Sequence, residues 1–319
     1  MKTVLLSALV LVAAIGGVAQ ASDVFMTGDL MASTSGGRYE QWRKVAGTWT
    51  KIDTLNNSGS GYTTGSAFDS TGNFYGTNFS NGRIEKFLGA GTPHTGSTLS
   101  SGYSSPESIV FSGTGDMYVG SVGGGIRRVD KNTGAVLDTF ISGTRVDWMD
   151  LAADGKTMYF SQEGRAIKRV DLSTNTILSD FAALAGTGEA FALRILADGG
   201  VLVADDQNIK RLDATGATIQ TYDVSGVNEW FALNLDSDGT SFWTGSFSNG
   251  TLYKFDIATG TLLDSFNTLA GGSALYGVSI FGEVTVSTVV PLPSAAWLGL
   301  AMLAGLGVFQ ARKRRVELA

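Results

Sequence analysis

The feature that most constrains this fold is a repeat with a period of about 42 residues in the middle of the chain. Each copy contains a short run that ends in an apolar side chain, and successive copies of that side chain lie 42, 41, 42 and 43 residues apart. These apolar residues are Phe87, Val129, Val170, Leu212 and Phe255. A turn glycine recurs at nearly the same period, at Gly72, Gly115, Gly155, Gly199 and Gly239. Two independent markers with one period indicate a structural repeat.

The pattern within each copy predicts four short strands. In one copy we expect them at Phe191–Leu196, Val201–Val203, Ile209–Asp213 and Ile219–Tyr222, with a tight turn at Asp198-Gly199. A period of ~40–45 residues with four strands is typical of a β-propeller blade, whereas a parallel β-helix would need much shorter rungs. Glycine supplies 43 of the 319 residues, which agrees with many turns rather than long helices. We therefore predict an all-β fold made of propeller blades.

The residues on either side of the repeat predict a sixth blade. Five complete units run from about residue 62 to residue 270. Before them we expect three strands, at Val24–Thr27, Arg38–Val45 and Thr48–Thr54. After them we expect one strand within residues 274–282. One strand from one end and three from the other would complete a blade and leave no open edge in the ring. The predicted six-bladed propeller spans residues 22–285, and its closure would stabilise a chain that has no cysteine.

Residues 1–21 have the pattern of a secretory signal peptide. Lys2 supplies a positive charge, Leu5–Val18 is apolar, and Ala19-Gln20-Ala21 forms a small-residue cleavage site. An uncleaved membrane anchor is the alternative, but the apolar stretch is short for one. The pattern predicts export of the chain by the Sec machinery and a mature protein that begins near Ser22.

The C-terminal part of the chain predicts a transmembrane helix at residues 295–311. Ala295–Phe309 contains no charged residue. A basic cluster follows closely, at Arg312, Lys313, Arg314 and Arg315. Such a cluster stays on the cytoplasmic side of a membrane, which would place the basic tail 312–319 inside the cell and the propeller outside. A helix buried in a protein core is the alternative, and four consecutive basic residues argue against it.

A proline motif lies in the linker 286–294, directly before this helix. Its sequence is Val290-Pro291-Leu292-Pro293, and it contains two of the four prolines of the chain. The order of this motif, an apolar helix with a tryptophan and a terminal basic cluster resembles the PEP-CTERM sorting signal in its VPLP variant. The resemblance covers roughly residues 289–315. It implies recognition by an exosortase, cleavage near the prolines and transfer to the bacterial cell surface or the extracellular matrix.

One repeat also resembles a known propeller family. Val201–Asp213 contains a strand, an Ala-Asp pair, a short turn with Asn208 and a final Ile-Lys-Arg-Leu run, which is similar to the NHL-repeat pattern. Asp205 and Asn208 match the turn positions of that family, and the other units lack this pair. Over residues 62–270 the chain resembles six-bladed NHL-like and lactonase-like propellers. This resemblance implies a wide range of roles, which includes binding scaffolds, lactone hydrolases and lyases.

Acidic residues occur near the start of the first strand in four repeats. They are Glu107, Asp147, Glu189 and Glu229. First strands line the central channel of a propeller, so these carboxylates are expected near its mouth. Calcium takes six to eight oxygen ligands, and the lactonase-like resemblance implies such a site here. The first two acids lie eight residues before the turn glycine and the last two lie ten before it, so the four are not equivalent. Solvated loop charge is the alternative.

Large aromatic residues occur in the same stretches, and they are Trp148, Trp230, Phe231 and Trp243. Exposed rings there would bind a ligand by stacking on the sugars of an extracellular matrix, whereas rings buried between blades are the alternative. His94, the one histidine, lies in a loop between repeats, where we expect it to be solvated rather than catalytic. The chain contains neither G-x-S-x-G nor H-E-x-x-H, and we predict no catalytic residue.

A basic residue recurs in the third strands, at Lys86, Arg128, Arg169, Arg211 and Lys254. In four repeats an aspartate follows two residues later, at Asp130, Asp171, Asp213 and Asp256. Alternate residues of a strand point to one face, so the pattern predicts ion pairs with neighbouring strands, and a basic binding stripe is the alternative. Residues 22–290 contain 18 basic and 28 acidic residues, a net charge of −10, which argues against nucleic acid as a partner.

Together these patterns predict an exported protein, first anchored in the membrane and then located at the cell surface or in the extracellular matrix. Its expected role is a non-catalytic binding or scaffold module for a glycan or a protein. The expected partners are the Sec machinery, an exosortase-type enzyme, the membrane through the C-terminal helix, and an exopolysaccharide or surface protein. No cofactor other than calcium is expected. The alternative function is a calcium-dependent, lactonase-like hydrolase or lyase at the channel mouth.

Overall fold

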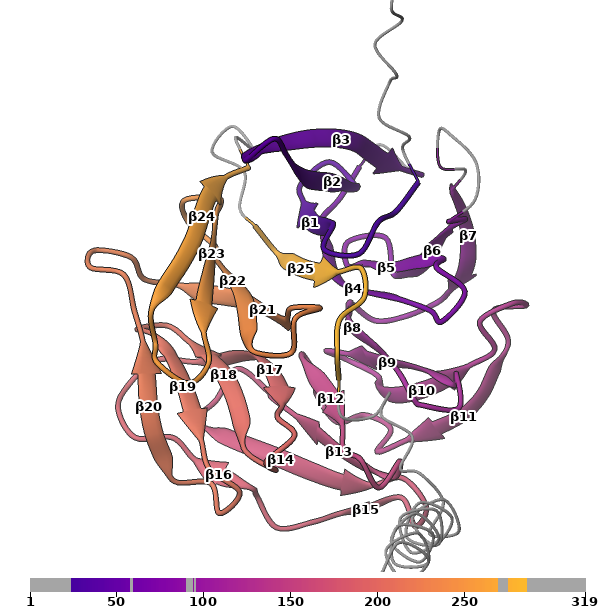
Figure 1. The fold of residues 1–319 in the computed structure, drawn as a ribbon. Helices are drawn as coiled ribbons and strands as arrows, with labels where there is room; N and C mark the ends of the chain where they lie inside the picture. The colour runs from indigo at the N-terminus through magenta and orange to yellow at the C-terminus, as the bar shows by residue number, and fades with distance from the viewer. Residues whose placement is uncertain (1–23, 58–59, 90–93, 95, 269–274, 286–319) are drawn as a thin grey trace, which may run out of the picture.

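Six antiparallel sheets surround a common axis in the computed structural model, which describes residues 24–57, 60–89, 94, 96–268 and 275–285. Figure 1 shows the sheets as the sectors of a wheel. The innermost strands contact one another around the ring. They are β25 (Gly277–Ile280), β4 (Thr63–Phe68), β8 (Pro106–Phe111), β12 (Met149–Leu151), β17 (Ala190–Ile195) and β21 (Trp230–Leu235). The fold is therefore the six-bladed β-propeller that the period predicts.

The other strands of each blade follow outward in chain order. The second strands are β1 (Leu30–Thr34), β5 (Phe74–Asn78), β9 (Met117–Ser121), β13 (Thr157–Phe160), β18 (Val201–Asp205) and β22 (Ser241–Ser246). The third strands are β2 (Arg38–Val45), β6 (Arg83–Phe87), β10 (Gly125–Val129), β14 (Ala166–Asp171), β19 (Ile209–Leu212) and β23 (Thr251–Asp256). The outer strands are β3 (Thr48–Asn56), β7 (Gly96–Ser101), β11 (Val136–Phe140), β15 (Thr176–Ile177) with β16 (Ala182–Ala183), β20 (Thr218–Tyr222) and β24 (Leu262–Asn267).

The closing blade combines strands from both ends of the described chain. β25 pairs with β1 in an antiparallel register that places Ala32 opposite Val278. This pairing confirms the expected closure by one strand and three. The first of the three N-terminal strands was expected at Val24–Thr27, and that position is wrong because β1 begins later. Gly28 adopts a φ of 89° and turns the chain, so Phe25 is buried in an apolar cluster instead of pairing in a sheet.

The blade that begins with β12 has an interrupted outer strand. β15 and β16 both pair with β14, whereas the repeat predicts one continuous strand at this position. Between them, Ser179 accepts a side-chain hydrogen bond from Arg169, and Asp180 pairs with Lys168 at 3.1 Å. Side chains of β14 thus bind the residues between β15 and β16, which have no strand pairing, and this keeps the outer edge attached to the blade.

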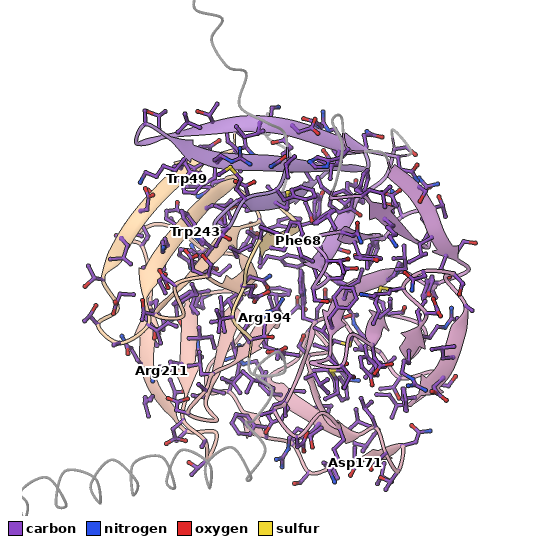
Figure 2. All side chains as sticks on the ribbon, turned by 45° about the vertical axis from the view of Figure 1, so that its right-hand side comes forward. Trp49, Phe68, Asp171, Arg194, Arg211 and Trp243 are labelled. Atoms are coloured by element: carbon purple, nitrogen blue, oxygen red, sulfur yellow. The ribbon has the colours of Figure 1, made fainter. Side chains whose placement is uncertain are left out.

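Apolar side chains fill the spaces between the blades. The inner strands β8, β17 and β21 are buried along their whole length, because each lies between neighbouring sheets. Large rings pack at these boundaries, and Trp49 of β3 in the closing blade meets Trp243 of β22 in the neighbouring blade with ring centroids 5.2 Å apart (Figure 2). The outer strands are more exposed, as in β11.

The repeated basic residues and aspartates of the third strands have separate roles. Three of the five basic side chains pair with carboxylates of their own blade: Arg128 with Asp138 at 2.5 Å, Arg211 with Asp198 at 2.8 Å and Lys254 with Asp236 at 2.6 Å. Lys86 and Arg169 instead donate to Lys131 and Ser179. The expected ion pairs are thus confirmed at three positions. The aspartates instead accept backbone N–H groups in the turn that follows the third strand, as Asp213 does from Thr215 at 2.8 Å. They act as turn residues rather than as cross-strand partners.

The predictions for both ends of the chain lie outside the described residues. They are the signal peptide 1–21, the linker 286–294 with the sorting motif, the apolar helix 295–311 and the basic tail 312–319. Within the part of the chain that the structure describes, no helix is long and apolar enough to cross a membrane. The signal peptide, the sorting motif and the membrane helix stay predictions.

Candidate functional site

A cavity of about 400 Å³ opens at the end of the channel where the inner strands begin. Two kinds of segment form its wall. One is the stretch that leads into an inner strand, and the other is the turn between the second and third strands of a blade. Every blade contributes at least one lining residue, so the cavity depends on closure of the ring.

Five aromatic rings form a continuous row along this cavity, which we call the aromatic arc. They are Tyr62, Tyr276, Phe247, Phe231 and Phe191. The centroids of consecutive rings are 4.9, 5.2, 5.6 and 4.8 Å apart, which are contact distances for aromatic pairs. The rings come from four different blades, and their packing against one another holds an apolar surface in place at the mouth of the channel.

Five carboxyl side chains also line the cavity, and we call them the acidic wall. They are Glu107, Glu163, Glu189, Asp206 and Glu229. Backbone hydrogen bonds tie three of them together: the N–H of Asp206 donates to the carbonyl of Glu189 at 3.1 Å, and the N–H of Glu229 donates to that of Asp206 at 2.7 Å. Glu229 has a φ of 57°, a conformation that costs free energy for a residue other than glycine.

Arg145 is a basic residue of the cavity wall, and its charge is already compensated. Its Nε donates to both carboxylate oxygens of Asp147 at 2.8 Å, and its Nη2 pairs with Glu163. Glu189 and Asp206 form no ion pair with a basic side chain among the described residues. Glu229 forms none within those ranges either. One side of the cavity therefore carries uncompensated negative charge.

Glu107 of the acidic wall and Asp147 form a buried carboxyl pair. Glu107 is 3% exposed and Asp147 is 0% exposed. Burial, and then the charge of Asp147, raise the pKa of Glu107 well above its usual value. Burial also raises the pKa of Asp147 to about 6, against the opposing effect of Arg145. Burial and mutual repulsion thus favour the protonated form of these two carboxyl groups more than water does.

The structure places three of the four sequence-predicted acids on one cavity. Glu107, Glu189 and Glu229 line it, and Asp147 lies behind Arg145. Within the described ranges, no group of three or more histidine, aspartate or glutamate side chains is arranged to hold a metal ion. This arrangement gives the calcium hypothesis no support from geometry.

The sequence-predicted aromatic residues occupy two kinds of place. Trp148, Trp230 and Trp243 are buried among the blades, at 3%, 0% and 2% exposure, and have no free face for a ligand in this structure. Phe231 belongs to the aromatic arc. The alternative of rings buried between blades thus describes the three tryptophans, because large rings fill the wedge between neighbouring sheets.

Several residues that line the first cavity were not among the predicted site residues, although the repeat pattern contains a signal for them. The turns between second and third strands contribute Phe79, Val122, Glu163, Asp206 and Phe247. These positions are 43, 41, 43 and 41 residues apart, so they follow the period of the repeat. A search of each repeat at this turn position would have identified them, whereas the rings at Tyr62 and Tyr276 fall outside that register.

His94 is not the solvated loop residue that the sequence suggests. It is 8% exposed, and its ring stacks on Phe25 with centroids 4.0 Å apart. Its Nδ1 lies 2.9 Å from the carbonyl oxygen of Leu88. His94 does not line the cavity. The expectation of solvation was wrong because the turned N-terminal segment covers this ring.

A second cavity of about 540 Å³ lies at the opposite end of the channel. Glu283, just after β25, lines this cavity and accepts hydrogen bonds from Arg194 Nε at 2.9 Å and Asn234 Nδ2 at 3.0 Å. Figure 2 shows Arg194 near the centre of the wheel. Arg194 and Asn234 are thus joined through Glu283, and we take this end as a structural joint and the first cavity, with its row of aromatic rings, as the better candidate for ligand binding.

The fold and the site define a six-bladed β-propeller with one acid- and aromatic-lined mouth. No protein-family model matches the chain, and no curated protein matches its sequence. A chain from a crystal structure of a nidogen/laminin complex is similar, with a TM-score of 0.63 and 16% identity over 80% of this chain and 99% of that chain. The WD40 β-propeller domain of Doa1 has a TM-score of 0.59 and 16% identity over 80% and 83% of the two chains. At this identity the similarity shows the fold alone.

Proposed function

We propose that this protein is an exported, non-catalytic binding module that holds a glycan or protein ligand in the cavity where the inner strands begin. The observation that carries the proposal is the aromatic arc, because contiguous rings held at an open mouth supply a rigid apolar contact surface. The similarity to a chain of a nidogen/laminin complex agrees with a binding role for a propeller of this shape.

Binding of the full chain, purified in detergent, to a glycan array and to isolated exopolysaccharide tests this proposal. Tyr276→Ala and Phe247→Ala should each weaken binding by about tenfold, because each removes one ring from the arc. Leu263→Ala is the matched control, since it removes a 51% exposed apolar side chain from the outer strand β24. Binding that survives both ring variants unchanged would place the ligand elsewhere.

The proposed location is the cell surface or the extracellular matrix, reached by export and C-terminal sorting. The support is the order of a signal-peptide pattern, a V-P-L-P motif, an apolar segment and a basic cluster in the sequence. Mass spectrometry of the surface-exposed protein should show a chain that begins near Ser22 and ends near Pro293. Replacing both Pro291 and Pro293 by Ala should leave an uncleaved chain in the membrane fraction. Normal release of that variant would contradict sorting through this motif.

A hydrolase or lyase activity at the same cavity is a second candidate function, and the Glu107–Asp147 pair favours it. Burial raises the pKa of Glu107, and a carboxyl group with a raised pKa is suited to act as a general acid. Turnover of lactones and acidic polysaccharides, with and without added calcium, tests this candidate. Glu107→Gln should abolish any turnover, whereas Asp138→Asn on the outer strand should not. A lack of turnover under all of these conditions would leave the binding function alone.

A further inference from the structure

We infer that the group recognised by this cavity is an organic cation, a protonated amine carried on an apolar body. This inference rests on the proposed binding function and names the chemistry of its ligand. It combines three observations: the cavity itself, the uncompensated charge of the acidic wall and the aromatic arc along the same cavity.

The charge of the acidic wall selects a cation. Arg145 is engaged by Asp147 and Glu163, so Glu189, Asp206 and Glu229 face the cavity without a basic partner among the described residues. Burial and the neighbouring carboxylates of Glu163 and Asp206 raise the pKa of Glu189, which shows that like charges are crowded at this place. A ligand ammonium would relieve this repulsion, whereas an anionic ligand would increase it.

Backbone hydrogen bonds join the segments that carry Glu189, Asp206 and Glu229, and Phe247 donates its N–H to the carbonyl of Glu229 at 2.9 Å. The side chains of Glu189 and Glu229 are themselves exposed. The hydrogen bond from Phe247 links the acidic wall to the aromatic arc. The backbone segments of the two surfaces are therefore held in a fixed relation, so binding has to order the side chains but not the backbone.

The aromatic arc selects the rest of the ligand. A cavity of about 400 Å³ accommodates a body of one or two rings, and stacking on the arc removes its apolar face from water. A neutral ligand of the same shape would displace water from the carboxylates without compensating their charge, which is unfavourable. A cation bound beside aromatic rings gains a further favourable interaction with their faces. Cation and apolar body are thus both required.

Tyramine and N-acetyltyramine are matched probes, because acetylation removes the charge and keeps the ring. Calorimetry on the full chain in detergent should show tyramine binding at least about tenfold tighter than N-acetyltyramine. Glu189→Gln and Asp206→Asn should each weaken tyramine binding by about fivefold or more. Asp138→Asn, which removes one negative charge from β11, is the control and should leave binding unchanged.

A stability measurement separates a binding role of the acids from a structural one. If Glu189 is kept for ligand binding, Glu189→Gln should raise Tm by about 1–2 °C while it weakens tyramine binding. A structural role would lower Tm instead. This readout also shows directly that the variant folds.

A second pair of probes identifies the source of the amine. A glucosamine dimer and its N-acetylated counterpart test an amino sugar, and tyramine tests a small aromatic amine. Preference for either charged form over its acetylated partner supports the inference. If the charged and acetylated forms bind equally well, and Tyr276→Ala weakens the binding of both, the inference is overturned and the proposed function stays intact. No binding of any probe or array glycan would overturn both.

Discussion

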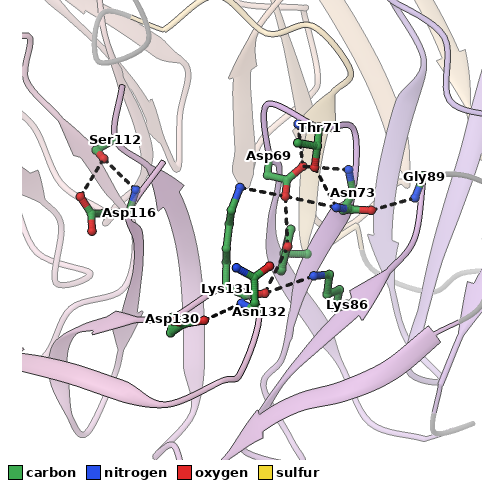
Figure 3. A network of polar contacts seen from close by, with 11 residues as sticks. Asp69, Thr71, Asn73, Lys86, Gly89, Ser112, Asp116, Asp130, Lys131 and Asn132 are labelled. Carbon is green, nitrogen blue, oxygen red and sulfur yellow. Dashed lines mark hydrogen bonds and ion pairs between the residues drawn. The ribbon is translucent and has the colours of Figure 1, made fainter. Parts of the chain in front are cut away.

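Asp69 shows how one buried carboxylate joins two blades. It lies in the turn between β4 and β5 and accepts hydrogen bonds from Thr71 Oγ1 at 2.7 Å and the N–H of Asn73 at 3.0 Å (Figure 3). Lys131, from the turn after β10 in the next blade, pairs with it at 3.1 Å. Burial alone would raise the pKa of Asp69, but these hydrogen bonds outweigh burial and lower the pKa to about 2. The ionised form is therefore stabilised by folding.

We predict that Asp69→Asn lowers the free energy of unfolding by about 1–2 kcal/mol at pH 7, after allowance for solvent screening. A carboxylate with a lowered pKa stabilises the fold above its unfolded value of 3.8, and this contribution is lost as the pH falls toward 2. Urea unfolding at pH 7 and at pH 2.5 should show a smaller difference between wild type and variant at the lower pH. Asp223→Asn, at an exposed loop carboxylate, is the control. Equal losses at both pH values would contradict the prediction.

The sequence predicts the role of a residue well when its hydrogen-bond partners are close in the chain. Asp205 has one partner that is close in the chain and one that is distant. Its Oδ1 accepts the N–H of Gln207 at 3.2 Å, as the turn pattern indicates. Its Oδ2 pairs with Arg165 of the preceding blade at 2.6 Å, 40 residues away. Only the arrangement of the blades brings that second partner near, so the ion pair could not be inferred from the spacing.

The inner strands β25, β4 and β8 approach one another so closely that two positions need glycine. A Cβ on Gly65 of β4 would lie 2.3 Å from the carbonyl oxygen of Glu107 on β8. A Cβ on Gly277 of β25 would lie 2.2 Å from the carbonyl oxygen of Thr64. Both obstacles are backbone atoms, which cannot rotate away as a side chain can. These glycines allow three adjacent blades to meet at the axis.

We predict that Gly65→Ala lowers the free energy of unfolding by about 3 kcal/mol or more, because the blades must separate to accept the methyl group. Gly115→Ala is the matched control. Gly115 has a φ of 89° but open space around its Cβ position, so the change should cost only about 1 kcal/mol. Equilibrium unfolding in urea measures both. Equal losses for the two variants would show that the close approach does not limit stability.

At the element scale, the sequence predicts the strands well inside the repeat and less well at its N-terminal end. The alternation and turn residues of the repeat predict the strands from β17 to β20 within one or two residues. They fail for β1, where an apolar run at Val24–Thr27 was mistaken for a strand. Phe25 of that run is buried by packing from another blade, so its burial gives an apolar pattern without sheet pairing.

For the whole molecule, the period predicted the blade number and the closure, but it did not predict the cavity. Two independent markers at one spacing define how many units fit between residues 62 and 270. The cavity wall draws on two kinds of position in the repeat, and its charge depends on Arg145 being engaged by Asp147 and Glu163. The ion pairs of Arg145 depend on how the loops meet in the assembled ring, and the sequence of a single repeat does not predict them.

The closed ring is completed by a buried joint at the end of the channel opposite the candidate site. Glu283 follows β25 and binds Arg194 of β17, which is 4% exposed, together with Asn234 of β21. Burial raises the pKa of the nearby Asp150 to about 6, against the opposing charge of Arg194. If Glu283 is removed, the guanidinium stays buried with its main partner gone. The joint therefore connects the last strand of the chain to two blades formed earlier in the sequence.

We predict that Glu283→Ala lowers the free energy of unfolding by about 2–4 kcal/mol, because it leaves a buried charge uncompensated. Lys44→Ala is the control: it breaks the ion pair between Lys44 and Asp264, which also joins the closing blade to its neighbour but is exposed, and it should cost less than about 1 kcal/mol. In urea unfolding, the Glu283→Ala/Arg194→Met double variant should lose less than the sum of the two single variants. Additive losses, or a loss for Glu283→Ala no larger than that for Lys44→Ala, would mean that strand pairing between β25 and β1 closes the ring without this joint.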